Sequence, residues 1–265
     1  MTVYPSILIL IWAIWAYQPM EFVFFPAKAP PYVPAIFDRA NLFCKEARIL
    51  VVTAHPDDSE FYAAGTLTKL HAAGAHIDQV VCTDGDKGYY IFVDSRANRR
   101  TRRAEQKAAS SEYGVSSLTF LGFPDGRLRN DAELRAELKT AIQELKPTHI
   151  LTFDANFPTR IHHQDHSRCA EAVAQVRTEL AGTITLLGFS TRGPNFVDDV
   201  SDIWPQRLRM LTFHASQFHG ERLRGVTNMI TESANDAGEL IKTEYGESFR
   251  VILPKENESP STLKG

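Results

Sequence analysis

The 265-residue chain has few cysteines and no excess of positive charge. Its 3 cysteines are too few and too scattered for a disulfide framework or a four-thiolate zinc site, and they suit a reducing environment. The formal net charge is -3, so no surplus of Lys and Arg exists to neutralise the phosphates of a nucleic acid. With 43% hydrophobic and 23% charged residues, the composition is that of an ordinary globular domain.

Long hydrophobic stretches are confined to the N-terminus. Residues 4–25, YPSILILIWAIWAYQPMEFVFF, are interrupted only by Gln18, Pro19 and Glu21. As one helix, rising about 1.5 Å per residue, this segment is long enough to cross a bilayer. Its uninterrupted part, residues 7–17, is shorter than the roughly 20 residues of a usual span. No Lys or Arg precedes it, which argues against a cleaved secretory signal.

The N-terminal segment therefore predicts a single-pass membrane anchor over residues 1–26, with a docked hydrophobic arm or a cleaved signal as alternatives. The first cations, Lys28 and Arg39, follow it and favour a cytoplasmic position for the remainder of the chain. Residues 27–47 are rich in proline and predict a stiff linker. Residues 48–254 then form one main domain, and residues 255–265 a flexible tail. Whether the chain forms a homo-oligomer stays open.

From residue 48 onward, short apolar runs alternate with helical patterns. We expect strands at 49–53, 76–83, 117–121, 149–153 and 183–187, and helices at 60–73, 98–113, 132–145 and 163–180. This alternation predicts an α/β fold: a Rossmann-like open sheet, mostly parallel, with strand order 3-2-1-4-5 and helices on both faces. After residue 189 the pattern loosens, and helices are expected at 207–213 and 238–245.

Two polar segments follow strands of this sheet. AHPDDSE, residues 54–60, follows the first strand, and RIHHQDH, residues 160–166, comes shortly after the fourth. In the order 3-2-1-4-5 these two strands are neighbours where the chain direction reverses, and such folds bind ligands at that point. The two segments are therefore expected to face each other.

These segments contain the side chains of a metal site. His55 and Asp58 lie three residues apart at a strand-to-helix turn, and His163 and His166 share one face at a helix start. Two imidazole nitrogens, one carboxylate and a water form the open shell of a catalytic zinc. Asp57 is then free to accept a proton from that water. Taken alone, each segment has a plainer explanation, as helix-capping carboxylates or as a solvated histidine cluster.

The same motifs make the chain resemble the PIG-L/LmbE family of zinc-dependent de-N-acetylases, which have an A-H-P-D-D motif and a later H-x-D-H motif. The resemblance extends over residues 48–250. It includes TDGDKG (83–88), RRAEQKAASSEYGV, LGFPDGRL (121–128) and HASQF (214–218). It implies the Rossmann-like fold inferred above, and eukaryotic members have a similar N-terminal membrane segment.

The resemblance also implies roles for single residues. His55, Asp58 and His166 match the ligands of Zn2+, for which another divalent ion can substitute. Asp57 matches the general base, and His163 matches the residue that stabilises the oxyanion or protonates the departing amine.

Three neighbours of these residues depart from the family pattern or have two readings. His162 has no counterpart in the family. Asp165 matches the acid between the two histidines, with helix capping or orientation of His55 or His166 as the alternative. Ser59 separates Glu60 from the aspartate pair, which leaves any role of Glu60 in doubt.

Four further residues are expected to contact substrate. Arg102, or its neighbour Arg103, is one, although a solvated basic helix is the alternative. Asp125 (a turn residue otherwise), His214 (a structural histidine otherwise) and Asp84 are the others. Cys82 is expected to be a buried strand residue rather than a nucleophile.

The resulting function hypothesis is a metal-dependent hydrolase that removes acetyl from an N-acetylglucosamine-type conjugate, either a small molecule or a lipid-linked amino sugar. A non-catalytic, metal-containing sugar-binding module tethered to a membrane, or a hydrolase of another amide, is the alternative. A nucleotide-dependent oxidoreductase is disfavoured, because no glycine follows the first strand until Gly65.

Overall fold

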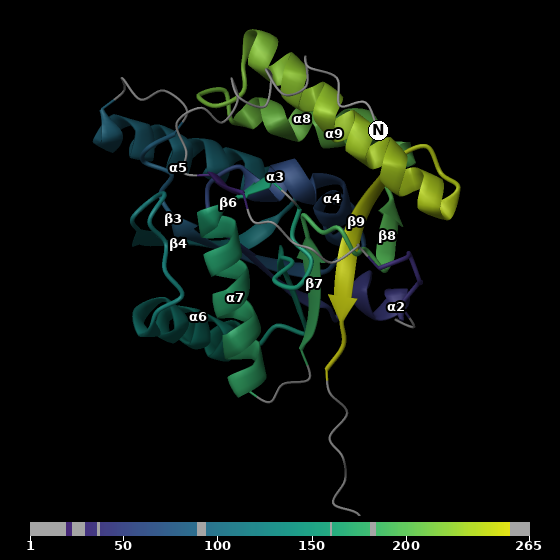
Figure 1. Cartoon of the computed structure of the whole chain (residues 1–265), viewed down its shortest axis with the longest axis horizontal. Coiled ribbons are helices and arrows are strands. Elements are labelled where there is room, and N and C mark those ends of the chain that lie inside the picture. Colours follow the sequence, from purple (N-terminus) through teal and green to yellow (C-terminus); the bar gives the residue numbers. More distant parts are fainter. Residues whose placement is uncertain are drawn as a thin grey trace, which may run out of the picture.

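A computed structural model describes residues 20–22, 30–35, 38–88, 94–159, 161–180 and 184–254. Within them, seven strands form one sheet in the order β4-β3-β2-β5-β7-β9-β8 (Figure 1). The strands are β2 (Arg48–Thr53), β3 (His76–Thr83), β4 (Val115–Phe123), β5 (His149–Phe153), β7 (Thr185–Phe189), β8 (Phe196–Asp199) and β9 (Gly246–Ile252). The first five in the sheet are parallel. They are the five expected strands in the predicted order 3-2-1-4-5, so the Rossmann-like α/β fold is confirmed.

Helices cover both faces of this sheet. They are α2 (Arg39–Leu42), α3 (Asp58–Tyr62), α4 (Ala64–Ala72), α5 (Ser95–Glu112), α6 (Ala132–Leu145), α7 (Gln164–Glu179), α8 (Trp204–Arg209) and α9 (Gly220–Ile241). In Figure 1, α6 and α7 lie together on one side of the sheet, whereas α3, α4, α5, α8 and α9 gather on the other. Helix α7 packs on β2 and β5, which places its first turn near the end of β2.

The central strands are buried because they are apolar on both faces. Residues 49–52 of β2 are at most 1% exposed, and all five residues of β5 are buried. A parallel strand covered by helices on both sides is expected to be a continuous apolar run rather than an alternating one. Their burial fixes the positions at which β2 and β5 end, and therefore the positions of the loops that follow.

The C-terminal part differs from the prediction. A helix was expected at 238–245, but α9 ends at Ile241, Lys242 adopts a left-handed conformation (φ 64°), and the chain then enters β9. Strands β8 and β9 were not expected, and they extend the sheet with antiparallel pairs. Their pairing depends on a close approach, because a Cβ at Gly246 would lie 2.5 Å from Cγ1 of Val197.

The expected membrane anchor over residues 1–26 is not supported. In the described part of the chain, no helix has both the length and the apolar character needed to cross a bilayer. Of residues 1–26, only Met20–Phe22 are described, and they form the short strand β1, paired antiparallel with β6 (Ile161–His163). The predicted tail, residues 255–265, lies outside the described residues.

Candidate active site

The two polar segments meet at the point where the sheet reverses direction. His55 lies in the turn between β2 and α3, while His163 caps α7 and His166 lies in its first turn. The ring centroid of His55 is 4.6 Å from that of His163 and 5.3 Å from that of His166. The convergence expected from the topology is therefore present.

Three side chains bring possible metal-ligand atoms together. Ligand atoms of His55, Asp58 and His166 all lie within 4.8 Å of one another, and all three residues are buried. Asp58 Oδ2 accepts hydrogen bonds from the backbone N–H groups of Ala54 (3.1 Å) and His55 (2.7 Å). Its Oδ1 lies 3.1 Å from Nε2 of His166. One carboxylate oxygen thus shapes the loop while the other faces the imidazole.

The donor set fits a catalytic metal ion. Two imidazoles and one carboxylate are the protein ligands found at several catalytic zinc sites, where a fourth position stays open. Burial alone would raise the pKa of Asp58, but the neighbouring imidazoles of His166 and His55 lower it well below its ordinary value. A buried carboxylate kept ionised in this way is suited to a cation. A second group, His55, His163 and Asp165, overlaps the first.

His55 is held from behind by two carboxylates. Its Nε2 lies 3.2 Å from Oδ1 of Asp125 and 3.2 Å from Oδ2 of Asp165. Burial lowers the pKa of His55, but its hydrogen bonds to these carboxylates and to Asp58 raise it well above the ordinary value. With Nε2 donating to the carboxylates, Nδ1 faces Asp58 at 3.6 Å. Carboxylate support of this kind commonly fixes the orientation of a metal-binding histidine.

Asp165 and Asp125 also tie the neighbouring loops to this histidine. Asp165 accepts hydrogen bonds from the backbone N–H groups of Gly126 (2.6 Å) and Leu128 (3.0 Å). Asp125 Oδ2 accepts one from the N–H of Lys87 at 3.0 Å. The loops after β3 and β4 therefore meet on the far side of His55.

Asp57 has an unusual backbone and a charged neighbour. Its φ is 98°, in the left-handed region, which typically costs a residue other than glycine about 1–3 kcal/mol. Its Oδ2 accepts a hydrogen bond from Arg102 at 3.0 Å, and its side chain is 15% exposed. Burial raises the pKa of Asp57, Arg102 opposes this, and the charge of Asp58 adds to it, so the pKa lies above the ordinary value. A carboxylate with a raised pKa is suited to accept a proton.

Arg102, expected to contact substrate, spans the loops beside Asp57. Its guanidinium also donates to the carbonyl oxygens of Gly85 (2.9 Å) and Pro56 (2.6 Å). Glycine is required at position 85, because its φ is +61° and a Cβ there would lie 2.3 Å from the guanidinium nitrogen Nη1 of Arg102. Arg102 is therefore a buried link between two loops and the Asp57 carboxylate.

His163 carries its proton on Nε2. Its Nδ1 accepts a hydrogen bond from the backbone N–H of Asp165 at 3.1 Å, so Nδ1 has to present a lone pair. Its Nε2 is buried without a hydrogen-bond partner among the described residues. Burial, followed by the charges of His55 and His166, lowers the pKa of His163 to about 3. The side chain is thus a neutral imidazole with a free N–H donor.

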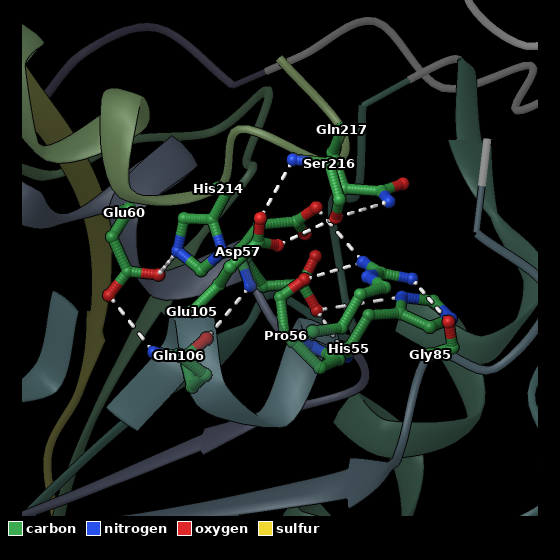
Figure 2. A network of polar contacts seen from close by, with 12 residues as sticks. His55, Pro56, Asp57, Glu60, Gly85, Glu105, Gln106, His214, Ser216 and Gln217 are labelled. Carbon is green, nitrogen blue, oxygen red and sulfur yellow. Dashed lines mark hydrogen bonds and ion pairs between the residues drawn. The ribbon is translucent and has the colours of Figure 1, made fainter. Parts of the chain in front are cut away.

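A second polar network lies behind Asp57 (Figure 2). The carboxylate of Glu60 accepts hydrogen bonds from Ser59, Gln106 and Tyr113 on one oxygen, and contacts His214 Nε2 at 2.8 Å on the other. His214 is buried, and its Nδ1 has no hydrogen-bond partner in the described part of the chain. Glu60, whose role was in doubt, and His214, expected to contact substrate, therefore belong to one network.

Three further residues singled out in the sequence have contacts away from the metal cluster. Asp84 pairs with Arg99 at 3.1 Å and with Arg103 at 3.3 Å. Cys82 is fully buried, with its sulfur 3.8 Å from that of Cys169, as expected of a strand residue. His162 is buried, and its Nδ1 lies 2.8 Å from the carbonyl oxygen of Thr159.

Sequence reasoning missed Gln106 and Tyr113. Both are in or directly after α5, whose buried face is largely polar: Asn98, Arg102, Gln106 and Ser110 are all buried and follow one another at intervals of four residues. In the sequence only Arg102 and Arg103 of this helix were singled out, as candidates for substrate contact, with a solvated basic helix as the alternative. The spacing was the available signal, because residues four apart share one face of a helix.

The fold and site define a class of protein: an α/β enzyme with a histidine–aspartate cluster, suited to a metal ion, where its parallel sheet reverses direction. Residues 50–177 match the PIG-L family, described as GlcNAc-PI de-N-acetylase. The chain is 31% identical over 188 residues to a probable N-acetyl-alpha-D-glucosaminyl L-malate deacetylase 2 of Bacillus cereus, covering 65% of this chain and 84% of that protein. The chain belongs to the PIG-L family.

Two diacetylchitobiose deacetylases are also similar. The enzyme of Thermococcus kodakarensis is 32% identical over 188 residues, covering 64% of this chain and 70% of that protein. The structure of N,N'-diacetylchitobiose deacetylase from Pyrococcus horikoshii, in complex with an inhibitor, has a TM-score of 0.75 at 25% identity, covering 85% and 91% of the two chains.

Proposed function

We propose that this protein is a metal-dependent deacetylase that hydrolyses the acetamide of an N-acetylglucosamine-type conjugate, with zinc as the metal. The observation that carries the proposal is the buried cluster of His55, Asp58 and His166, with the raised-pKa carboxylate of Asp57 beside it. The deacetylase relatives named above support the type of bond and the amino-sugar substrate.

His55, Asp58 and His166 are the residues that would hold the ion. When bound, such an ion polarises a carbonyl oxygen and lowers the pKa of water toward about 7. The chain's own contribution is to keep Asp58 ionised and to fix the ring of His55 through Asp125 and Asp165. In this proposal Asp125 supports a ligand and does not contact substrate directly.

Asp57 is the proposed general base. Its carboxylate accepts the proton of the attacking water and then delivers it to the nitrogen of the departing amine. Arg102 holds the carboxylate through its 3.0 Å contact. General-base catalysis typically contributes on the order of a hundredfold to ten-thousandfold in rate.

His163 is the proposed donor to the oxyanion. A neutral imidazole with its proton on Nε2 donates one hydrogen bond to the negative oxygen of the tetrahedral intermediate. The hydrogen bond that Nδ1 accepts from the Asp165 N–H disfavours a doubly protonated ring. This supports the oxyanion role over protonation of the amine. Loss of one such donor typically lowers kcat on the order of a hundredfold or more.

The test is acetate release by zinc-reconstituted protein from three compounds that the names of similar deacetylases indicate as substrates: N-acetylglucosaminyl L-malate, diacetylchitobiose and N-acetylglucosaminyl inositol. The expected result is turnover of at least one, with about one zinc per chain. Asp57→Asn is expected to keep the metal and lose turnover. If Asp57→Asn matched the parent in kcat while binding the same zinc, the base assignment would be wrong. If zinc bound but none of the three were cleaved, the substrate class would be wrong.

A further inference from the structure

The backbone of Asp57 is held by a side chain on a distant helix. The N–H of Asp57 donates to Oε1 of Gln106 at 2.8 Å, and Gln106 is fully buried on α5 (Figure 2). Asp57 is the residue before α3, and its own side chain makes no capping hydrogen bond. The left-handed peptide of Asp57 therefore depends on a neighbour for its polar contact.

The amide of Gln106 can take only one orientation. Its Nε2 lies 3.1 Å from Oε1 of Glu60 and 3.1 Å from Oγ of Ser110. Because an ionised carboxylate only accepts hydrogen bonds, Glu60 requires the amide nitrogen on its side. A flipped amide would place an oxygen against Glu60 and a donor against the N–H of Asp57. Glu60 thus directs the carbonyl oxygen of Gln106 at Asp57.

Gln106 and Arg102 act on Asp57 from the same face of α5. They are four residues apart, and Arg102 binds the Asp57 carboxylate while Gln106 binds its peptide N–H. Two contacts from one rigid helix fix both the backbone and the carboxylate. Misplacement of a reacting group by about 1 Å can lower a rate on the order of a hundredfold.

We propose that Gln106, oriented by Glu60, is a positioning residue that holds the peptide of Asp57 in its left-handed conformation and thereby aims the general base. This inference rests on the proposed function, because it gives a purpose to the placement of Asp57. Within the described part of the chain, the hydrogen bonds of Gln106 reach Asp57, Ser59, Glu60 and Ser110, and none reaches a residue of the metal cluster.

The experiment compares Gln106→Met with Ser110→Ala in zinc-loaded protein. Gln106→Met keeps the side-chain length but removes the acceptor for the Asp57 N–H. Ser110→Ala removes a partner of the same amide nitrogen and leaves the contacts of Gln106 with Glu60 and Asp57. For Gln106→Met we expect kcat to fall at least about tenfold, with KM and zinc content unchanged. For Ser110→Ala we expect kcat within about twofold of the parent.

A second readout does not depend on turnover. The amide hydrogen of Asp57 is expected to exchange with solvent at least about tenfold faster in Gln106→Met, measured by NMR against the parent and Ser110→Ala. Should Gln106→Met fail to fold, the shorter amide of Gln106→Asn, which cannot span from Glu60 to Asp57, takes its place with the same expectations.

Unchanged kcat and unchanged exchange in the Gln106 variant would overturn the inference, as would equal losses in the Ser110 control. These failures are distinguishable from failure of the proposed function. An inactive Asp57→Asn with a fully active Gln106→Met leaves the function intact and removes only the positioning role. A fully active Asp57→Asn removes the base itself, whatever the Gln106 variants do.

Discussion

Two buried histidines of this protein are each held by carboxylates, but they face different parts of the site. His55 Nε2 contacts Asp125 and Asp165, and its other edge faces the metal-binding cluster. His214 Nε2 contacts Glu60, and its ring lies between Glu60 and Asp57 (Figure 2). The same kind of histidine–carboxylate contact therefore has two different roles in this protein. The first pair orients a proposed metal ligand, whereas the second supports the framework around the proposed base.

The largest effect is expected where the metal cluster itself is broken. His166→Ala removes one of its imidazoles and leaves both histidine–carboxylate pairs intact. We expect zinc below about a tenth of an equivalent after dialysis, and no turnover, because two ligands are too few for a stable site. Metal analysis and acetate release measure this. His76→Ala, at a partly exposed histidine that begins β3, serves as the control and should keep a full equivalent. Full zinc in His166→Ala would contradict the ligand assignment.

Asp165→Asn removes the charge of a carboxylate that contacts His55, while the side chain at position 165 keeps nearly the same size. Loss of such a supporting carboxylate typically lowers metal affinity or activity about 10–100-fold. Zinc affinity by competition with a chromophoric chelator, together with kcat, gives the size of the effect. Parent-like values for both would show that Asp165 is no more than a loop contact.

The acidic limb of the pH–rate profile tests the electrostatic environment of Asp57. The base works only when ionised, so kcat/KM is lost as the pH falls through its pKa, which lies above the ordinary value. Arg102 lowers that pKa, and Arg102→Met removes this effect. The acidic limb is therefore expected to move to higher pH. A limb that stays in place, or moves to lower pH, would contradict the electrostatic role of Arg102.

His214→Gln is expected to have the smallest effect on turnover and a clearer one on stability. Removing a buried, charge-assisted contact costs about 1–3 kcal/mol of unfolding free energy, with zinc content unchanged. The pKa of Glu60 is lowered, so its stabilisation is lost as the pH falls through that lowered value. The pKa of His214 is raised above 6.5, so its stabilisation is lost as the pH rises through that raised value.

The difference in unfolding free energy between parent and His214→Gln should therefore be greatest between these two pKa values. Urea unfolding at several pH values measures it. A difference that grew steadily toward high pH would contradict the ion pair. If His214→Gln lowered the zinc content as much as Asp165→Asn does, the two histidines would not differ in their role at the metal site.

The sequence was informative where chemistry and topology coincide. The apolar run of β2 and the histidines and aspartates after it predicted both a strand end and a site. The reversal of strand order predicted that His166 would lie near His55, and the two rings are 5.3 Å apart. Strand β8 was missed because it is a four-residue edge strand, and β9 because polar residues interrupt its apolar ones. The burial of both strands depends on packing against α9 rather than on their own pattern.

Contacts between distant side chains could not be predicted. That Asp125 faces His55 depends on where the loop after β4 turns, and that His163 is protonated on Nε2 depends on a single backbone N–H. The polar stripe of α5 could be recognised from its four-residue spacing. Its partner Glu60 could not, because the contact depends on the position of α3 relative to α5.

The position of the bound metal ion is the most direct test of the proposed function. Anomalous diffraction at the zinc absorption edge, from crystals of zinc-reconstituted protein, locates the ion without any assay. The expected result is one anomalous peak, which marks a zinc ion about 2.0–2.2 Å from the ligand atoms of His55, Asp58 and His166. A zinc ion bound to His163 and Asp165 instead, or full zinc content with no peak at this cluster, would contradict the proposed ligands.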